Sequence, residues 1–403
     1  MQDASRTPVV TESAVPPSPQ AVTGLILSGG GARAAYQVGV LAAIAELLPE
    51  GAANPFPVIV GTSAGAINAV GLACGALSFR EAIHSLTRVW KGFHTGQVYR
   101  ADFTGVLGQA LRFLGHSLLG LGRRRPVALL DSTPLRHLLA REMDFSGISA
   151  ALQQRKLRAV AVTAFGYDSG QAVTFYQGRA TIEPWLRHRR IGVPTRLCLE
   201  HLLASSAIPL LFAPVRIKRE YYGDGAVRQQ APISPALHLG ANRVLVIGVS
   251  GNPTNNGPDE GASGHASGRP PSLAQMGIHL LNSTFIDSLE GDIEVLQRVN
   301  YLGSLVPQER RCHEAGLREV EVLLVSPSRP LDEIAAKHRK ELPWAVRLFL
   351  RGPGATRASG AGVLSYLLFE RGYCHELIRL GYKDAMDKRA ELVRFLGLEE
   401  HCL

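Results

Sequence analysis

A serine at the centre of a glycine-flanked turn is the residue in this chain best suited to chemistry. Gly61-Thr62-Ser63-Ala64-Gly65 follows an apolar run at 57–60 and opens a helical pattern at 64–76. Small neighbours let a strand turn sharply into a helix and present the hydroxyl. Unpaired N–H groups at the start of that helix favour a developing negative charge. The pattern predicts a nucleophile, Ser63, on an elbow formed by Gly61 and Gly65; a tight turn with a capping serine is the alternative.

A second glycine turn lies about thirty residues earlier, after an apolar run at 22–27. Gly29, Gly30 and Gly31 expose backbone N–H groups that could bind an oxyanion or a phosphate. Gly29-x-Gly31-x-x-Ala34 also fits the dinucleotide fingerprint, which predicts an acidic residue at the end of the second strand. That position instead holds the Ser63 turn, and no Gly-Lys-Ser/Thr follows the glycines. The sequence therefore favours oxyanion binding.

A nucleophilic serine needs a base. None of the 13 histidines lies in a motif that marks a triad member, and those in helical patterns (His84, His137 and His201) are interpreted as surface or packing residues. The best candidate is Asp224, whose flanking glycines, Gly223 and Gly225, allow a tight turn that points the carboxylate inward. An ordinary Asp-Gly turn is the alternative.

In this order, the three motifs resemble the patatin-like phospholipase family. They are Gly29-Gly30-Gly31-x-Arg33, Gly61-Thr62-Ser63-Ala64-Gly65 and Asp224-Gly225-Ala226. The segments 204–209 and 212–214 resemble a further block of that family. The resemblance covers roughly residues 23–249. It departs from the family at Ala34, where a glycine is usual.

The resemblance implies a Ser–Asp dyad that hydrolyses fatty acyl esters of membrane lipids without calcium or another cofactor. Ser63 would be the nucleophile, and Asp224 its base and then its acid. N–H groups around Gly30 and Gly31, with that of Ala64, would bind the oxyanion. Gly29 and Arg33 belong to the same loop, and Arg33 occupies the place of the family's basic residue.

Such a dyad makes a physical demand on its carboxylate. A free aspartate is a weak base for a serine hydroxyl, and burial beside apolar groups raises its pKa and its basicity. We therefore expect Asp224 to be desolvated and within hydrogen-bonding reach of Ser63.

The apolar patterns predict alternating strands and helices. Strands are expected at 22–27, 57–60, 157–165, 172–176, 215–222, 243–249 and 319–325, and helices at 34–48, 64–76, 79–90, 104–121, 201–206, around 272–300 and towards the C-terminus. This order predicts an α/β fold, a three-layer α/β/α sandwich with a central, mostly parallel sheet.

The predicted organisation is a hydrolase domain at 21–250 between two less regular parts. Residues 1–20 are polar, lack a signal-peptide pattern and are expected to be a disordered tail. Residues 251–271 are rich in Gly, Pro, Asn and Ser, which predicts a flexible loop. Residues 272–403 are expected to be mainly helical and to pack on the same domain.

Composition and charge indicate the partners and the compartment of the protein. The net charge of +9 is clustered at 123–125, 187–190 and 216–219, which favours an anionic lipid surface over a merely solvated one. No basic helix with interleaved aromatics stands out, so nucleic-acid binding is not expected. The five cysteines form no Cys-x-x-Cys pair, and no apolar stretch is long enough to span a bilayer. A cytoplasmic protein in peripheral contact with membrane is expected.

Two amphipathic segments, 104–121 and 341–351, are candidates for that contact, with packing on the core as the alternative for both. Two other functions stay open. One is a catalytically silent lipid-binding or regulatory protein on the same fold, and the other is an esterase with a Ser-His-Asp triad.

Overall fold

The structure, a computed structural model, describes residues 21–102, 128–229, 231–250, 288–306, 319–351 and 361–398, with three isolated glycines between 103 and 127. Several predictions lie outside the described residues. These are the N-terminal tail at 1–20, the amphipathic segment at 104–121, the basic cluster at 123–125, the loop at 251–271 and the first part of the helical stretch expected at 272–300.

Ten strands of the described chain form one mixed sheet, in the order β10-β9-β1-β2-β3-β4-β6-β5, with β8 also paired to β3 and β7 to β8. The five adjacent strands from β10 to β3 are all parallel. Antiparallel pairs join β3 to β4 and to β8. The strands are β1 (Thr23–Leu27), β2 (Val58–Thr62), β3 (Ala159–Gly166), β4 (Ala172–Gly178), β5 (Trp185–Arg187), β6 (Arg190–Pro194), β7 (Val215–Ile217), β8 (Glu220–Asp224), β9 (Arg243–Ile247) and β10 (Glu321–Val325).

The sheet separates two apolar cores. Successive side chains of a strand point to opposite faces, and in β1 Leu25 and Leu27 enter one buried cluster while Ile26 enters the other. The larger core is covered by most of the helices, and the smaller one by α8 and α10. The α/β class and the central, mostly parallel sheet predicted from the sequence are therefore confirmed.

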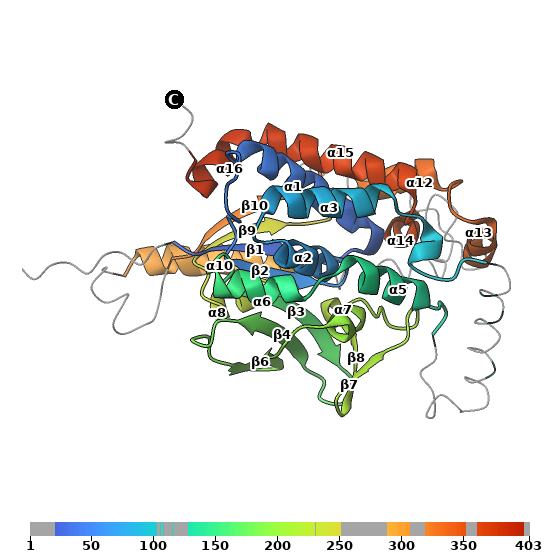
Figure 1. Cartoon of the computed structure of the whole chain (residues 1–403), viewed down its shortest axis with the longest axis horizontal. Helices are drawn as coiled ribbons and strands as arrows, with labels where there is room; N and C mark the ends of the chain where they lie inside the picture. The colour runs from blue at the N-terminus through green and yellow to red at the C-terminus, as the bar shows by residue number, and fades with distance from the viewer. Residues whose placement is uncertain are drawn as a thin grey trace, which may run out of the picture.

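Helices fill the layers on both sides of this sheet. Helices α1, α3 and α15 pack side by side over the strands β1, β2 and β9 (Figure 1). The helices are α1 (Ala35–Leu47), α2 (Ala64–Cys74), α3 (Phe79–Lys91), α5 (Thr133–Glu142), α6 (Ser146–Gln153), α7 (Leu199–Ser205), α8 (Ser234–His238), α10 (Ser288–Ser304), α12 (Leu331–His338), α13 (Trp344–Arg351), α14 (Ala361–Leu367), α15 (Arg371–Asp387) and α16 (Arg389–Leu396). Short 3-10 turns, η1 (Gly31–Ala34), η2 (Thr95–Gln97) and η4 (Gly225–Val227), complete the described elements.

One predicted strand is wrong. The apolar and aromatic run at 215–222 forms two short strands, β7 and β8, paired antiparallel as a hairpin. The turn passes through Lys218, whose φ is 54°, so the chain reverses at its most polar point. The basic clusters at 187–190 and 216–219 both lie on such hairpins, with Arg187, Arg189 and Lys218 exposed to solvent.

The chain beyond residue 271 contributes to the same core. Strand β10 pairs in parallel with β9, and α15 packs along α1. Both contacts favour a single α/β domain over two separate ones. That residues 21–250 and 272–403 form one domain stays a proposal, since the residues that connect them lie outside the described ranges.

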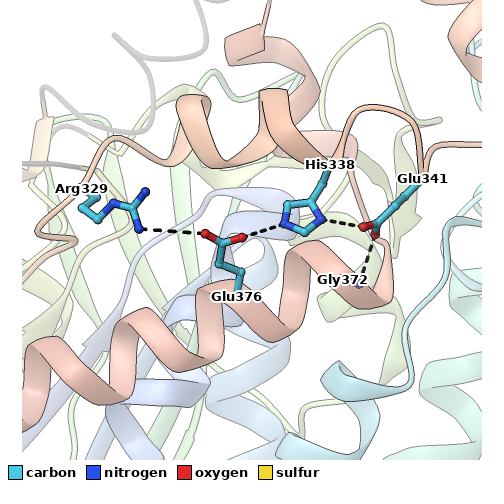
Figure 2. Close-up of polar contacts among 5 residues, drawn as sticks. All are labelled: Arg329, His338, Glu341, Gly372 and Glu376. Carbon is cyan, nitrogen blue, oxygen red and sulfur yellow. Dashed lines mark hydrogen bonds and ion pairs between the residues drawn. The ribbon is translucent and has the colours of Figure 1, made fainter.

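The end of α12 is held by a histidine between two carboxylates (Figure 2). His338 Nδ1 lies 2.6 Å from Glu341 Oε1, and His338 Nε2 lies 2.7 Å from Glu376 Oε2 on α15. Arg329 lies 4.0 Å from Glu376, and the Gly372 N–H donates to Glu341. Burial disfavours the imidazolium, but the hydrogen bonds and charges of the two glutamates outweigh it and raise the pKa of His338.

The contacts of His338 with Glu341 and Glu376 make the folding stability depend on pH. Because the pKa of His338 is higher in the folded state, its stabilising contribution is complete below the unfolded pKa and is lost as pH rises through the folded one. His338→Gln should therefore lower the melting temperature more at pH 6 than at pH 9, by on the order of 2 °C. His375→Gln, which removes an exposed histidine of α15, is the control. Equal losses at both pH values would contradict the prediction.

Candidate active site

Ser63 stands at the junction of β2 and α2 in a strained conformation. Its φ is 56° and its ψ is −130°, a region that non-glycine residues rarely adopt. The neighbouring glycines make the turn possible. A Cβ on Gly65 would lie 2.2 Å from the Leu27 carbonyl oxygen, and one on Gly61 would lie 2.4 Å from the Gly65 carbonyl oxygen. The predicted elbow is thus present, and it fits only glycine at both positions.

Sheet pairing brings Asp224 to this serine. Thr62, the last residue of β2, pairs with Thr163 of β3, and the next residue of β3, Ala164, pairs with Asp224 at the end of β8. Two residues 161 positions apart in sequence are thereby neighbours. The Ser63 hydroxyl donates to Asp224 Oδ2 over 2.6 Å. Nothing in the sequence predicts that register, because β8 reaches β3 from a distant hairpin.

The environment of Asp224 makes it a stronger base than an ordinary aspartate. The residue is 0% exposed, and this burial raises its pKa to about 7, against the opposing hydrogen bonds from the Ser63 hydroxyl and the Ala226 N–H. The Ala226 N–H donates to Oδ1 over 3.0 Å, which leaves Oδ2 for Ser63. The expected contact and desolvation are therefore both present.

A second serine, which the sequence left without a role, supports the elbow. Ser205 Oγ on α7 accepts the Ser63 backbone N–H over 2.8 Å and donates to the Thr163 carbonyl over 2.6 Å. Ser205 is fully buried and ties the elbow to β3, the strand that also positions Asp224. The segment 204–209, which contains Ser205, resembles a block of the same family. That resemblance was the only sequence signal that could have singled out Ser205.

The glycine loop lies beside the serine. Gly31, Ser63 and Ala64 line one cavity. Among the described residues, the N–H groups of Gly30 and Gly31 have no hydrogen-bond acceptor, and Ala64 is the first residue of α2, whose N–H has no intrahelical partner. Gly29 precedes them at the turn after β1. These N–H groups can stabilise a negative charge that develops in the cavity.

The side chain of Arg33, predicted at the same site, has its partners elsewhere. It is buried, but it does not line the cavity beside Ser63. Its guanidinium binds Asp332 and Ser365, and its backbone N–H donates to the Gly30 carbonyl. The side chain therefore faces the C-terminal part of the chain.

The cavity beside Ser63 is mostly apolar. It runs along α2 past Ile67 to Gly71, and α3, α5 and the chain near α14 form its walls. The apolar residues contributed by these walls include Leu86, Val89, Trp90, Phe93, Leu135, Leu138, Leu139, Met143, Leu367 and Phe369. Such a lining suits a hydrocarbon chain and offers few partners to a polar substrate.

Comparison of the sequence with known protein families gives a match. The sequence profile of the patatin-like phospholipases matches residues 25–237, which is more than half of the chain. The chain belongs to the patatin-like phospholipase family. The matched range includes the glycine loop, the Ser63 elbow and Asp224, and it ends before β9.

Other comparisons add little to the patatin assignment. A crystal structure of VipD from Legionella pneumophila is similar at a TM-score of 0.34 and 13% identity, over 90% of this chain and 67% of that one. A likeness at this level carries no argument about function. A search of curated proteins finds no significant match to the chain.

Among the described residues of this patatin-like chain, no histidine takes part in the contact between Ser63 and Asp224. Within the described ranges, no histidine lines the cavity, and Ser63 binds Asp224 directly. His201 is buried on α7, where its ring packs edge-on against Phe175 and contacts the Cys198 thiol. Burial lowers its pKa. His201 is therefore a packing residue, as the sequence indicated.

The described residues offer neither a metal site nor a membrane-spanning helix. They contain no group of three or more His, Cys, Asp or Glu side chains arranged to hold a metal ion. No helix among them is long and apolar enough to cross a membrane. Cys74, Cys198 and Cys374 are free thiols in this part of the chain.

Proposed function

We propose that the protein is a serine hydrolase of lipid acyl esters, with Ser63 as nucleophile and Asp224 as its base. The observation that carries the proposal is the 2.6 Å hydrogen bond from the Ser63 hydroxyl to a fully buried carboxylate. Family membership supports the class of substrate, and the apolar lining of the cavity supports an acyl chain.

The reaction would proceed in two halves. Asp224 takes the proton of Ser63 as Oγ attacks the ester carbonyl carbon, and the N–H groups of Gly30, Gly31 and Ala64 stabilise the oxyanion. The tetrahedral intermediate collapses to an acyl-serine, and Asp224 gives its proton to the leaving alcohol. A water molecule, deprotonated by Asp224, then attacks the acyl-serine. As this second tetrahedral intermediate collapses, the fatty acid leaves and Asp224 returns the proton to Ser63 Oγ.

Two exposed apolar side chains on α13 support access from a membrane surface. Trp344 and Leu348, one turn apart on α13, are 58% and 51% exposed, and Arg347 lies on the same helix. An interfacial helix combines such apolar and basic side chains. We propose peripheral contact with anionic lipid through this helix, which forms most of the segment expected at 341–351.

The proposal is tested by labelling with a fluorophosphonate. Mass mapping should locate a single adduct on Ser63 in the wild-type protein and none in Ser63→Ala. A panel of phospholipids, lysophospholipids and simple esters then identifies the substrate. Adduct formation at another serine would overturn the proposal.

The alternatives give different outcomes in the same assays. A catalytically silent lipid-binding protein would take up lipid without turnover, and Ser63→Ala would leave binding unchanged. A Ser-His-Asp esterase would lose turnover on substitution of a histidine. We expect no histidine substitution to have that effect, because Ser63 donates directly to Asp224.

A further inference from the structure

The glycine loop is attached to a part of the chain that lies outside the family match. Arg33 Nε donates to Ser365 Oγ on α14 over 2.8 Å, and Arg33 Nη2 forms an ion pair with Asp332 at the start of α12. The guanidinium carbon lies 4.1 Å from the centre of the Tyr366 ring. The Arg33 side chain is 4% exposed, so these partners replace nearly all of its hydration.

The same segment also fixes the loop through its backbone. Gly31 has a φ of 56°, and a Cβ there would lie 2.2 Å from the Tyr366 carbonyl oxygen. Tyr366 also lines the cavity beside Ser63. The loop that offers free N–H groups thus packs against α14 at Gly31 and is anchored to α14 and α12 through Arg33.

The anchor is itself held firmly in place. Ser365 Oγ lies 3.0 Å from Asp332 Oδ1, which joins α14 to α12. The opposite end of α12 is fixed to α15 through His338 and Glu376, as Figure 2 shows. Helix α12 therefore connects α15, which packs along α1, with the arginine of the glycine loop.

We infer that Asp332 and Ser365 are positioning residues for the oxyanion-binding loop and act on it through Arg33. This inference rests on the proposed function. It moves Arg33 from an oxyanion donor to an anchor, because its guanidinium is occupied by Asp332 and Ser365 and does not line the cavity. It also gives Asp332 and Ser365 a part in catalysis, although the family match ends at residue 237.

The physical reason is the precision that oxyanion binding requires. A displacement of the donor groups by about 1 Å can reduce the rate about 100-fold. The effect should be concentrated in kcat, since the donors bind the transition state more tightly than the ester. The apolar cavity would keep its shape, so KM should change little.

Asp332→Asn tests the inference, because it removes the charge on Arg33's partner and keeps the shape. The matched control is Asp384→Asn, in the same C-terminal region. Asp384 is buried, binds Tyr36 and Ser328, and does not touch Arg33. Activity is measured per active site, after titration with a fluorophosphonate, so that a misfolded fraction does not count.

We expect Asp332→Asn to lower kcat by about 10–100-fold with KM within about threefold of wild type. Asp332→Glu should restore part of the rate, and Asp384→Asn should keep it. In a double-mutant cycle, Asp332→Asn should cost little further rate once Arg33 is replaced by Met. A kcat for Asp332→Asn equal to that of Asp384→Asn would overturn the inference.

A readout independent of activity separates this inference from the proposed function. Hydrogen exchange should be faster in a peptide covering residues 28–34 of Asp332→Asn than in wild type or Asp384→Asn. If the wild-type protein hydrolyses no ester, the proposed function fails while the exchange experiment still decides the positioning. If the wild-type protein is active and exchange in the loop is unchanged by Asp332→Asn, the positioning alone fails.

Discussion

Replacement of Asp224 by Asn is expected to abolish ester turnover and, at the same time, to make the protein more stable. Asn can keep its oxygen on the Ala226 N–H and turn its NH2 group toward the Ser63 hydroxyl oxygen, where it cannot take the proton. The loss of a general base in such a position costs about 10²–10⁴-fold in kcat. The variant should fold as the wild type does, since its side chain has the same shape.

The gain in stability follows from the sign of the pKa shift. Burial raises the pKa of Asp224 to about 7, so the folded state binds more protons than the unfolded state between about pH 4 and pH 7. Folding stability therefore falls as pH rises through this range. An uncharged Asn avoids this effect, and the free energy of unfolding should rise by up to about 4 kcal/mol at pH 8.

Both halves of this prediction can be measured on the same samples. In wild type, kcat/KM should rise with pH and level off above about pH 7, because the base must be unprotonated. Thermal unfolding of wild type and Asp224→Asn should differ more at pH 8 than at pH 5. The control is Asp292→Asn, which changes a half-buried carboxyl group with a raised pKa, one that binds the Ile233 N–H away from the cavity. Full activity in Asp224→Asn would contradict the dyad.

The elements that carry this dyad could be predicted from local sequence. Short apolar runs followed by glycine turns predict β1 and β2, and their helical continuations predict α1 and α2, all within a few residues of the observed bounds. The glycines on either side of Ser63 indicate the elbow in the sequence, because no other residue fits at those positions. These features depend on neighbours in sequence, which is why the sequence reveals them.

The contacts that complete the site depend on tertiary structure. Ser205 reaches the Ser63 N–H from α7, and Asp332 and Ser365 reach Arg33 from α12 and α14. An Asp at the start of one helix and a Ser within another carry no local sign of such a role. The guanidinium of Arg33 could have faced the cavity or the core, and only the packing of α14 on the glycine loop decides between them.

The apolar cavity leads to a prediction about chain length. Gly71 lies eight residues after Ser63 along α2, which is about 12 Å at 1.5 Å per residue. It lines the cavity, and a Cβ there would face Leu86 Cδ2 at 2.8 Å and Met143 Cε at 3.5 Å. Gly71→Leu would therefore fill the part of the cavity remote from the nucleophile.

Gly71→Leu should leave short-chain esters nearly unaffected and reduce kcat/KM for long-chain esters about 100-fold. A leucine side chain occupies the room of about four methylene groups, and each buried methylene contributes about 0.8 kcal/mol. The variant should remain folded, since leucine is a better helix former than glycine by nearly 1 kcal/mol. The measurement compares p-nitrophenyl esters from butyrate to palmitate.

The graded control is Gly71→Ala, whose single methyl group meets the flexible end of Leu86 and should shorten the accepted chain only slightly. An equal loss for butyrate and palmitate would mean that the substitution disturbs the elbow itself. No loss for either would mean that the acyl chain leaves the nucleophile by another route. Discrimination that grows with chain length is the result expected if the chain lies along α2, because only the longer substrates reach Gly71.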